Sequence, residues 1–303
     1  MRSVYFGLLC AGMVLLVGCE ATVDPVVGTD KAFSLYGVLQ PRADTQWVRV
    51  YPIEDRLEPT APDSLAVTVT STDLTRGRRA TWHDSLIQED DGRYAHVYWS
   101  RTPIEYEHTY RVEVAGEGER TAQVEVPVPE NAALALHEPQ AETLPVIVPV
   151  HVTQAVPRLI NVEVEYYVQY DRQDNVAGSA SPTARLRVSY SGIPERTDGE
   201  WVVPIDLTED YRTLRERLVN ADLWNPTVGI VMRNMTLRLE VVNDAWNPPG
   251  GAFDPDVLVE PGTMSNVTDG FGFVGAGYRL KKRWTPSVEV LERAGWTDPA
   301  DLY

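Results

Sequence analysis

The chain has 303 residues and a formal net charge of −17, with 44 acidic residues against 27 lysines and arginines. Such an acidic chain is a poor match for nucleic acid, whose phosphates need Lys and Arg to neutralise them, and it also argues against a polybasic membrane patch. Only three cations are lysines, namely Lys31, Lys281 and Lys282. This composition fits either salt adaptation or an arginine-rich genome, and it concerns solubility rather than fold.

Residues 1–18 have the order of a secretory signal peptide, with a positive start, an apolar run over 4–17 and a small residue at the end. The run is shorter than the about 20 apolar residues that cross a bilayer. Leu16-Val17-Gly18-Cys19 resembles the lipobox of bacterial lipoproteins. That resemblance implies cleavage between Gly18 and Cys19 and lipidation of Cys19. The alternative is an ordinary secreted protein that keeps Cys19 as a free thiol.

The two cysteines of the chain are Cys10 and Cys19. If cleavage removes the first and a lipid occupies the second, the mature protein has no disulfide although it enters an oxidising compartment. Its stability then depends on packing, and its length allows two domains with hydrophobic cores. Residues 19–31 carry Pro and Gly without periodicity, so they are predicted to form a lipidated tether.

Residues 32–130 are predicted to form an immunoglobulin-like β-sandwich. Short runs alternate apolar and polar residues, which places one face of each strand in a core. Turn-forming residues separate these runs at the intervals typical of β-sandwiches. The predicted strands cover 33–39, 47–51, 65–70, 94–99, 110–114 and 122–128.

Tyr110 stands at the start of one of these strands. The stretch 104–114 resembles the approach to the sixth strand of fibronectin type III domains, in which a tyrosine hydroxyl folds back onto the preceding corner. The resemblance implies that Tyr110 is such a structural corner. The alternative is that Tyr110 is simply a large strand residue.

The first domain is followed by residues 131–143, which are predicted to be a linker. Residues 144–303 are predicted to form a second β-rich domain. Its one clear helical pattern lies near 208–220, with Thr208 as the predicted N-cap and acidic residues in the first turn. A short helix is also predicted over 286–294. The predicted strands cover 159–170, 184–190, 201–205, 228–232 and 237–241.

A glycine-rich aromatic segment follows Asn266 and contains Gly270, Gly272 and Gly275. Together with the lipobox, the tether and the immunoglobulin-like pattern, it resembles uncharacterised Bacteroidota-type outer-membrane lipoproteins that carry a domain of unknown function. Those proteins have the form Gly-x-Gly-x-Phe-Gly, whereas here Val274 stands at the aromatic position. The resemblance implies an outer-membrane lipoprotein, in many cases encoded near a TonB-dependent transporter. It implies no catalytic residues.

The sequence contains no motif for catalysis or metal binding. The histidines show no His-Glu-x-x-His spacing, and no Gly-x-Ser-x-Gly elbow occurs. The glycine-rich segment continues into residues 279–283, interpreted as a charged tail, rather than into a helix, so it is not predicted to bind phosphate. Its glycines are predicted to stand where the backbone has a positive φ or approaches another segment closely. No catalytic residue, metal or cofactor is therefore predicted.

The sequence predicts a non-enzymatic protein of the cell envelope, anchored in the outer membrane by the lipid on Cys19. It would act as a binding or accessory module, with a TonB-dependent transporter as candidate partner and no nucleic acid. One alternative is a protein that binds or degrades extracellular polysaccharide, because eight tryptophans could provide stacking surfaces. Another is a structural spacer or adhesin. The sequence does not predict which face of the membrane the protein occupies, or whether it binds a small molecule or a glycan.

Overall fold

The structure is a computed structural model that describes residues 30–53, 65–88, 94–137, 139, 144–170, 181–197, 199–221, 223, 229–246, 265–298 and 300. The predicted signal peptide and Cys19 lie outside the described residues. The described part of the chain is mainly β, with three sheets and two helices, which confirms the prediction of a mainly β fold. No helix in these ranges is long and apolar enough to span a membrane.

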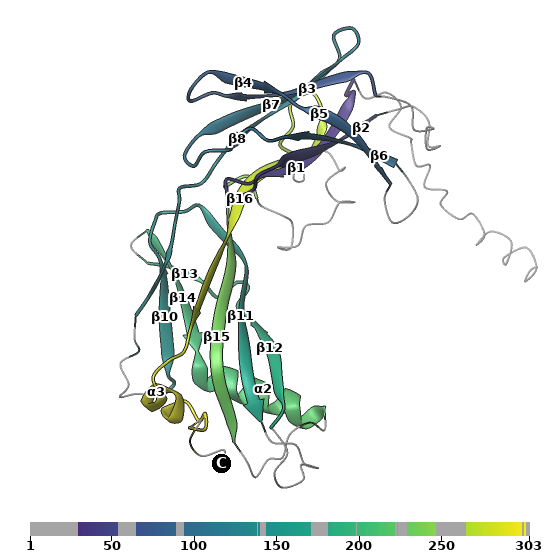
Figure 1. Cartoon of the computed structure of the whole chain (residues 1–303). Coiled ribbons are helices and arrows are strands. Elements are labelled where there is room, and N and C mark those ends of the chain that lie inside the picture. Colours follow the sequence, from purple (N-terminus) through teal and green to yellow (C-terminus); the bar gives the residue numbers. More distant parts are fainter. Residues whose placement is uncertain are drawn as a thin grey trace, which may run out of the picture. The chain divides into compact units, whose positions relative to one another are not determined.

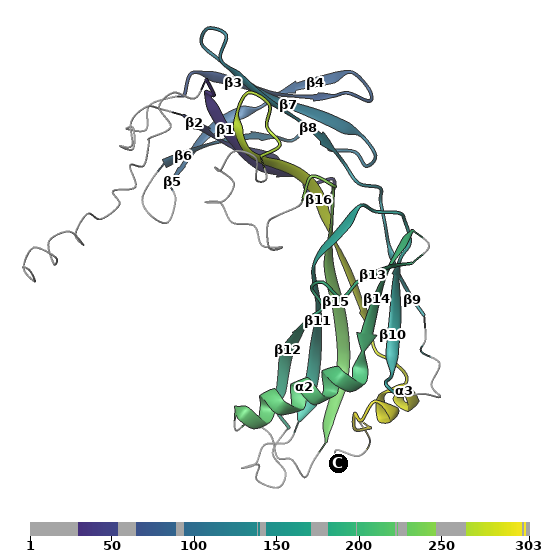
Figure 2. The ribbon, with the colours of Figure 1, turned by 180° about the vertical axis from the view of Figure 1, so that it is seen from behind.

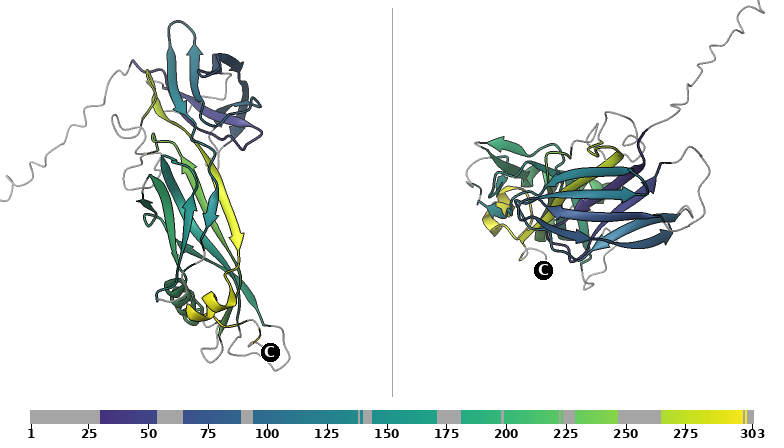
Figure 3. Two further views of the ribbon diagram at one scale, coloured as in Figure 1. Left: turned by 90° about the vertical axis from the view of Figure 1, so that its left-hand side faces the viewer. Right: turned by 90° about the horizontal axis from the view of Figure 1, so that it is seen from above.

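The first module is a pair of sheet layers that share one hydrophobic core (Figures 1 and 3). Valines alternate with polar residues along its strands, so they point into the space between the layers. One layer consists, in sheet order, of β4 (Arg78–Thr81), β3 (Val67–Asp73), β7 (Thr109–Gly116) and β8 (Thr121–Pro127). The other contains β1 (Phe33–Leu39), β2 (Gln46–Pro52), β6 (Tyr94–Ser100) and β5 (His83–Gln88).

Two strands of this module, β4 and β5, were not predicted from the sequence. Each lies at the edge of its sheet, and most of their side chains are exposed. An edge strand with an open outer face needs few apolar residues, so the alternation that marks the other strands is weak here.

The strand β16 (Phe271–Trp284) belongs to both halves of the described chain (Figure 1). Its residues 271–276 pair in parallel with β1, whereas residues 277–284 pair antiparallel with β15 (Ile230–Val242). Val274 and Ala276 are fully buried in the core of the first module. The charged stretch 279–283 is therefore a strand and not a tail, and one sheet runs from the first module into the second.

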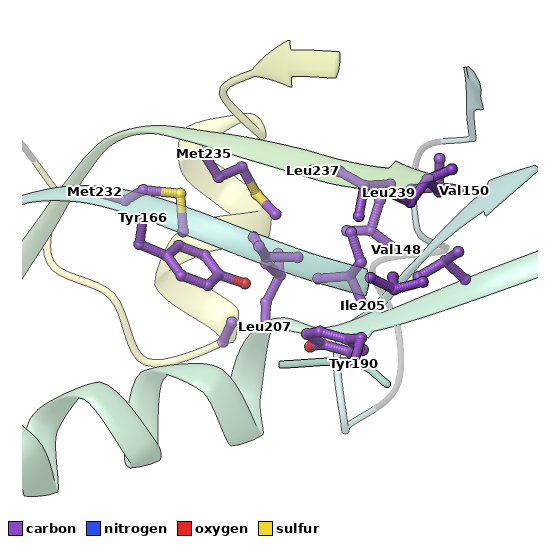
Figure 4. Close-up of a cluster of buried hydrophobic side chains, with 14 of the residues drawn as sticks. Val148, Val150, Tyr166, Tyr190, Ile205, Leu207, Met232, Met235, Leu237 and Leu239 are labelled. Carbon is purple, nitrogen blue, oxygen red and sulfur yellow. The ribbon is translucent and has the colours of Figure 1, made fainter. Parts of the chain in front are cut away.

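The second module has its own core between two layers. One layer is formed by β12 (Thr183–Ser189), β11 (Arg158–Tyr170), β15 and the second half of β16. The other has the order β13 (Glu195–Thr197), β14 (Glu200–Asp206), β10 (Ile147–Val152) and β9 (Leu134–Leu136). Figure 4 shows aliphatic side chains of both layers interleaved with Tyr166 and Tyr190. Strand β9 lies in the segment predicted as a linker, and β15 joins two strands that were predicted separately.

The two helices lie close to their predicted positions (Figure 2). Helix α2 (Leu207–Asn220) buries Leu214 and Leu218 in the second core. Its N-cap is Asp206 rather than the predicted Thr208, because the Asp206 carboxylate accepts the N–H groups of Thr208 and Glu209 at 3.0 and 2.9 Å. The C-terminal helix α3 (Val288–Arg293) is shorter than the predicted 286–294.

Arg42, in the loop after β1, joins the first module to β16. Its Nε donates to the Tyr106 hydroxyl at 2.7 Å, and its Nη1 donates to the carbonyl of Arg279 at 2.8 Å. Its Nη2 donates to Asn131 Oδ1 at 3.1 Å. The guanidinium also lies 4.7 Å from the centre of the Tyr278 ring, a cation–π distance. One side chain thus contacts both modules and the segment between them.

Tyr278 fixes the same segment from β16. Its hydroxyl accepts the N–H of Ala132 at 2.7 Å and donates to the carbonyl of Glu130. Tyr278 and Ala132 are 3 % and 2 % exposed, so water cannot replace these bonds readily. The chain that leaves the first module is therefore hydrogen-bonded to the strand that the modules share.

We predict that Tyr278→Phe lowers the free energy of unfolding by about 1–3 kcal/mol, because it leaves the buried N–H of Ala132 without its acceptor. Urea denaturation of the purified full chain measures the change. Tyr94→Phe is the matched control, since the Tyr94 side chain is 49 % exposed and such surface changes stay within about 0.5 kcal/mol. Equal stability of Tyr278→Phe and wild type would contradict this account.

Candidate functional site

The outer face of the sheet β12-β11-β15-β16 gathers charged side chains. These residues alternate with core residues along each strand, and the strand register sets them opposite one another. We call this surface the charged face. Its cations outnumber its acids, although the whole chain has a net charge of −17. It consists of Arg185, Arg187, Arg238, Arg279, Lys281 and Arg283 with Glu163, Glu165 and Glu240.

Glu165 is the buried acid at the centre of the charged face, with a relative exposure of 8 %. Arg238, Arg187 and Arg185 approach its carboxylate at 2.9, 3.3 and 3.7 Å. A buried carboxylate is costly unless it is paired, and here three guanidinium groups surround it. This part of the face is internally neutralised, which suits a structural role.

The β16 side of the charged face is different. Arg279 pairs with Glu240 at 2.8 Å, but its side chain is 85 % exposed. Lys281 and Arg283 are exposed and make no ion pair with any described residue. These three cations stand at every second position, so their Cα atoms are separated by about 7 Å along one face. They form a row of positive charge that the protein itself leaves largely uncompensated.

A depression of about 630 Å³ opens on the same face. It forms where β11 departs from regular pairing at Asn161, which has φ 51°. Glu163, Arg238, Arg279 and Lys281 are among the residues that line it. The depression therefore offers charge-assisted hydrogen-bond donors and acceptors to a polar partner group.

A second cluster of ionisable groups lies inside the second module. The Asp210 carboxylate, on α2, accepts hydrogen bonds from the hydroxyls of Tyr166 and, at 2.7 Å, Tyr190. Burial raises the pKa of Asp210 to about 6, and the two hydroxyl groups oppose this rise. The Tyr166 ring is stacked on Trp296 with their centroids 5.5 Å apart.

This cluster has no access to a substrate. Asp210, Tyr166 and Tyr190 are 2 %, 0 % and 4 % exposed, and the aliphatic core surrounds the rings (Figure 4). Their mutual bonds satisfy the polar groups that folding removes from water. We assign the cluster to the stability of the second module rather than to catalysis.

The raised pKa of Asp210 makes stability depend on pH. The folded state holds the proton up to about pH 6, whereas the unfolded chain releases it near 3.8, so stability falls as pH rises from about 4 to about 6. The loss amounts to about 3 kcal/mol. We predict that Asp210→Asn flattens this fall in urea denaturation measured at pH 4, 5, 6 and 7. Glu216→Gln is the control and should keep it, because it removes an exposed acid of the same helix; an unchanged slope in Asp210→Asn would refute the assignment.

The described histidines make local contacts only. His108 Nδ1 lies 2.9 Å from Asp73, and His96 Nδ1 lies 3.1 Å from Asp84. Burial alone would raise the pKa of Asp73, but hydrogen bonds from His108 and two backbone N–H groups outweigh it and leave that pKa below its usual value. The remaining histidines are His83, which packs against an aromatic ring, and His137 and His151, whose rings lie 4.6 Å apart. Within the described ranges, no group of three or more His, Cys, Asp or Glu residues could hold a metal ion.

Tyr110 lies at the beginning of β7, and its hydroxyl accepts the N–H of Glu105 at 2.9 Å. Burial raises the pKa of this tyrosine, whose relative exposure is 3 %. The hydrogen bond folds the ring back onto a residue five positions earlier, which is the contact that a tyrosine corner makes.

The glycine-rich segment supports the junction of β16 with β1. Gly272 has φ 97°, and a Cβ there would lie 2.2 Å from the carbonyl oxygen of Leu35. Side chains would be excluded at Gly270 and Gly275 too, where a Cβ would meet neighbours at 2.7 and 2.8 Å. The Asn266 amide donates to the carbonyl of Val274 and accepts its N–H, at 2.8 and 3.1 Å. Asn266 and the glycines thus hold β16 close to β1 and to the segment that precedes it.

Comparison with known proteins gives little further guidance. No family model and no curated protein matches the chain. Among solved structures, the C-terminal globular domain of an oligosaccharyltransferase from Pyrococcus abyssi is similar over 68 % of this chain, at 10 % identity and a TM-score of 0.22. The chain spans about half, 46 %, of that structure. A likeness this weak carries no argument about function.

The charged face and the Asp210 cluster were not identified from the sequence. The alternating acids of 159–170 indicated a strand with one polar face, but the cations that surround them come from three other strands. Asp210 lies one turn before Leu214 on the buried side of α2. The sequence signal for that cluster was therefore an acidic residue on the apolar face of a predicted helix.

Proposed function

We propose that this protein is a non-enzymatic, lipid-anchored module of the cell envelope that binds an acidic partner protein through the charged face. The largely uncompensated row formed by Arg279, Lys281 and Arg283 carries this proposal. A protein with so few cations relative to acids gains nothing in solubility from grouping them. Grouped cations produce a local positive potential that attracts and orients an acidic surface.

Edge protection is the competing explanation of the same row. The second half of β16 is bonded to β15 on one side, and charged residues on such an edge discourage pairing with other chains. Edge protection needs charge of either sign, whereas docking of an acidic partner needs positive charge. Charge reversal therefore separates the two explanations.

We further propose that the first module is immunoglobulin-like. The order β1-β2-β6-β5 facing β3-β7-β8 supports this, because it corresponds to the ABED and CFG layers of immunoglobulin domains. The hydrogen bond from Glu105 N–H to the Tyr110 hydroxyl also supports it. Such domains commonly present or space binding surfaces, which agrees with a role outside catalysis.

The anchor and partner follow from resemblance in the sequence. The lipobox at residues 16–19 supports attachment to the outer membrane through a lipid on Cys19. The resemblance to Bacteroidota-type lipoproteins encoded near TonB-dependent transporters makes such a transporter the first partner to test. The proposal assigns no metal or cofactor to the protein.

We predict that Cys19→Ala blocks lipidation, so that the protein either stays unprocessed or leaves the membrane fraction. Membrane fractionation and mass spectrometry of the N-terminal peptide measure this. Cys10→Ala is the control, because it changes a cysteine inside the signal without touching the lipidation site. Normal processing and outer-membrane recovery of Cys19→Ala would exclude the lipoprotein proposal.

We predict that Lys281→Glu reduces recovery of the partner by roughly tenfold when the lipidated protein is crosslinked in cells and purified from membranes. Recovery should also fall with added salt, because exposed charges are screened. Lys282→Glu is the matched control: it changes charge equally, but strand alternation directs Lys282 to the opposite side. If Lys281→Glu and Lys282→Glu both recover the partner as well as wild type does, edge protection is favoured over docking.

A further inference from the structure

A row of aromatic side chains crosses the first module on the outer face of its β5-β6-β2 layer. His83 lies directly opposite Trp99, which lies directly opposite Trp47. The core residues Val48 and Tyr98 are a directly opposed pair at the adjacent positions, so the row points away from the core. We call these three residues the aromatic row.

The aromatic row is open to solvent and ordered by its own contacts. Trp47 is 46 % exposed, and His83 is exposed as well. The rings of His83 and Trp99 lie 4.8 Å apart, and Trp99 Nε1 donates to the Ser85 hydroxyl at 3.0 Å. Trp82, by contrast, is buried in the core with its Nε1 bonded to Ser71. The row therefore holds large apolar rings at the surface, where they add nothing to a core.

Two arginines flank the row. The guanidinium of Arg49 lies 5.9 Å from the Trp47 ring, and that of Arg101 lies 5.8 Å from the Trp99 ring. Arg101 is exposed and makes no ion pair with a described residue. The site thus combines flat ring faces with positive charge, on a surface of an otherwise acidic protein.

We propose that the aromatic row binds an acidic polysaccharide, that is, a polymer of pyranose rings bearing carboxylates. The C–H groups on one face of a pyranose ring are weakly positive and apolar, so they pack against the negative face of an indole. The sugar carboxylates then pair with Arg101, which supplies the charge complementarity. This site is independent of the charged face, which lies on the second module.

The dimensions of the row favour an extended chain over a small molecule. Neighbouring strands are about 4.8 Å apart, so three strands place the rings of His83 and Trp47 about 10 Å apart, close to the length of a disaccharide. The surface is an open sheet face, so a polymer can continue beyond both ends.

The test measures binding of the full chain, purified in detergent, to polygalacturonate, alginate and hyaluronan by affinity electrophoresis and calorimetry. We expect binding to at least one of them, with weaker binding to polygalacturonate whose carboxylates are methyl-esterified. Trp47→Ala should lower the affinity at least about tenfold, whereas Trp47→Phe should stay within about threefold because it keeps a ring. Arg101→Gln should reduce the preference for the acidic form over its ester.

Leu86→Ala is the matched control, since Leu86 is 43 % exposed but lies on the opposite side of β5 from His83. Lys281→Glu should also leave sugar binding unchanged, so failure of the partner proposal can be told apart from failure of this one. The inference is overturned if none of the three acidic polymers binds, or if Trp47→Ala binds as tightly as wild type. A dimer that depends on Trp47 and excludes sugar would overturn it too.

Discussion

The parallel pairing of β16 with β1 is the constraint on which the described structure depends. It requires the two backbones to approach so closely at Gly272 that no side chain fits there, and it brings Val274 and Ala276 into the first core. The same strand then pairs with β15 in the second module. A parallel pair needs a long crossover, and here strands β2 to β15, which include most of the second module, lie between β1 and β16.

The junction residues act together with this strand. Arg42 contacts the Tyr278 ring and the segment that leaves the first module, and the Tyr278 hydroxyl satisfies that segment's backbone. Such bonds contribute little individually but become costly to lose when they are buried. The modules are consequently joined by hydrogen bonds and a continuous sheet, not by a free linker.

The two proposed binding surfaces follow from one geometric rule applied twice. Side chains alternate across a strand, so a sheet with one buried face must present every second residue on the other. In the second module many of those residues are charged, and in β2, β5 and β6 they include the aromatic row. A lipid anchor on the same chain would raise the local concentration of both surfaces near the envelope, which favours simultaneous binding of weak partners.

The sequence by itself determined the mainly β class, most of the central strands and the place of α2, because period-two and helical patterns are local properties of the chain. It also carried the lipobox, which lies outside the described residues. Only the tertiary structure decided the rest: that 279–283 is a strand, that 131–143 contributes β9, and that cations from three strands share a face with the acids of β11. Strand partners and shared faces depend on pairing between distant segments, and no local pattern specifies which strands will be neighbours.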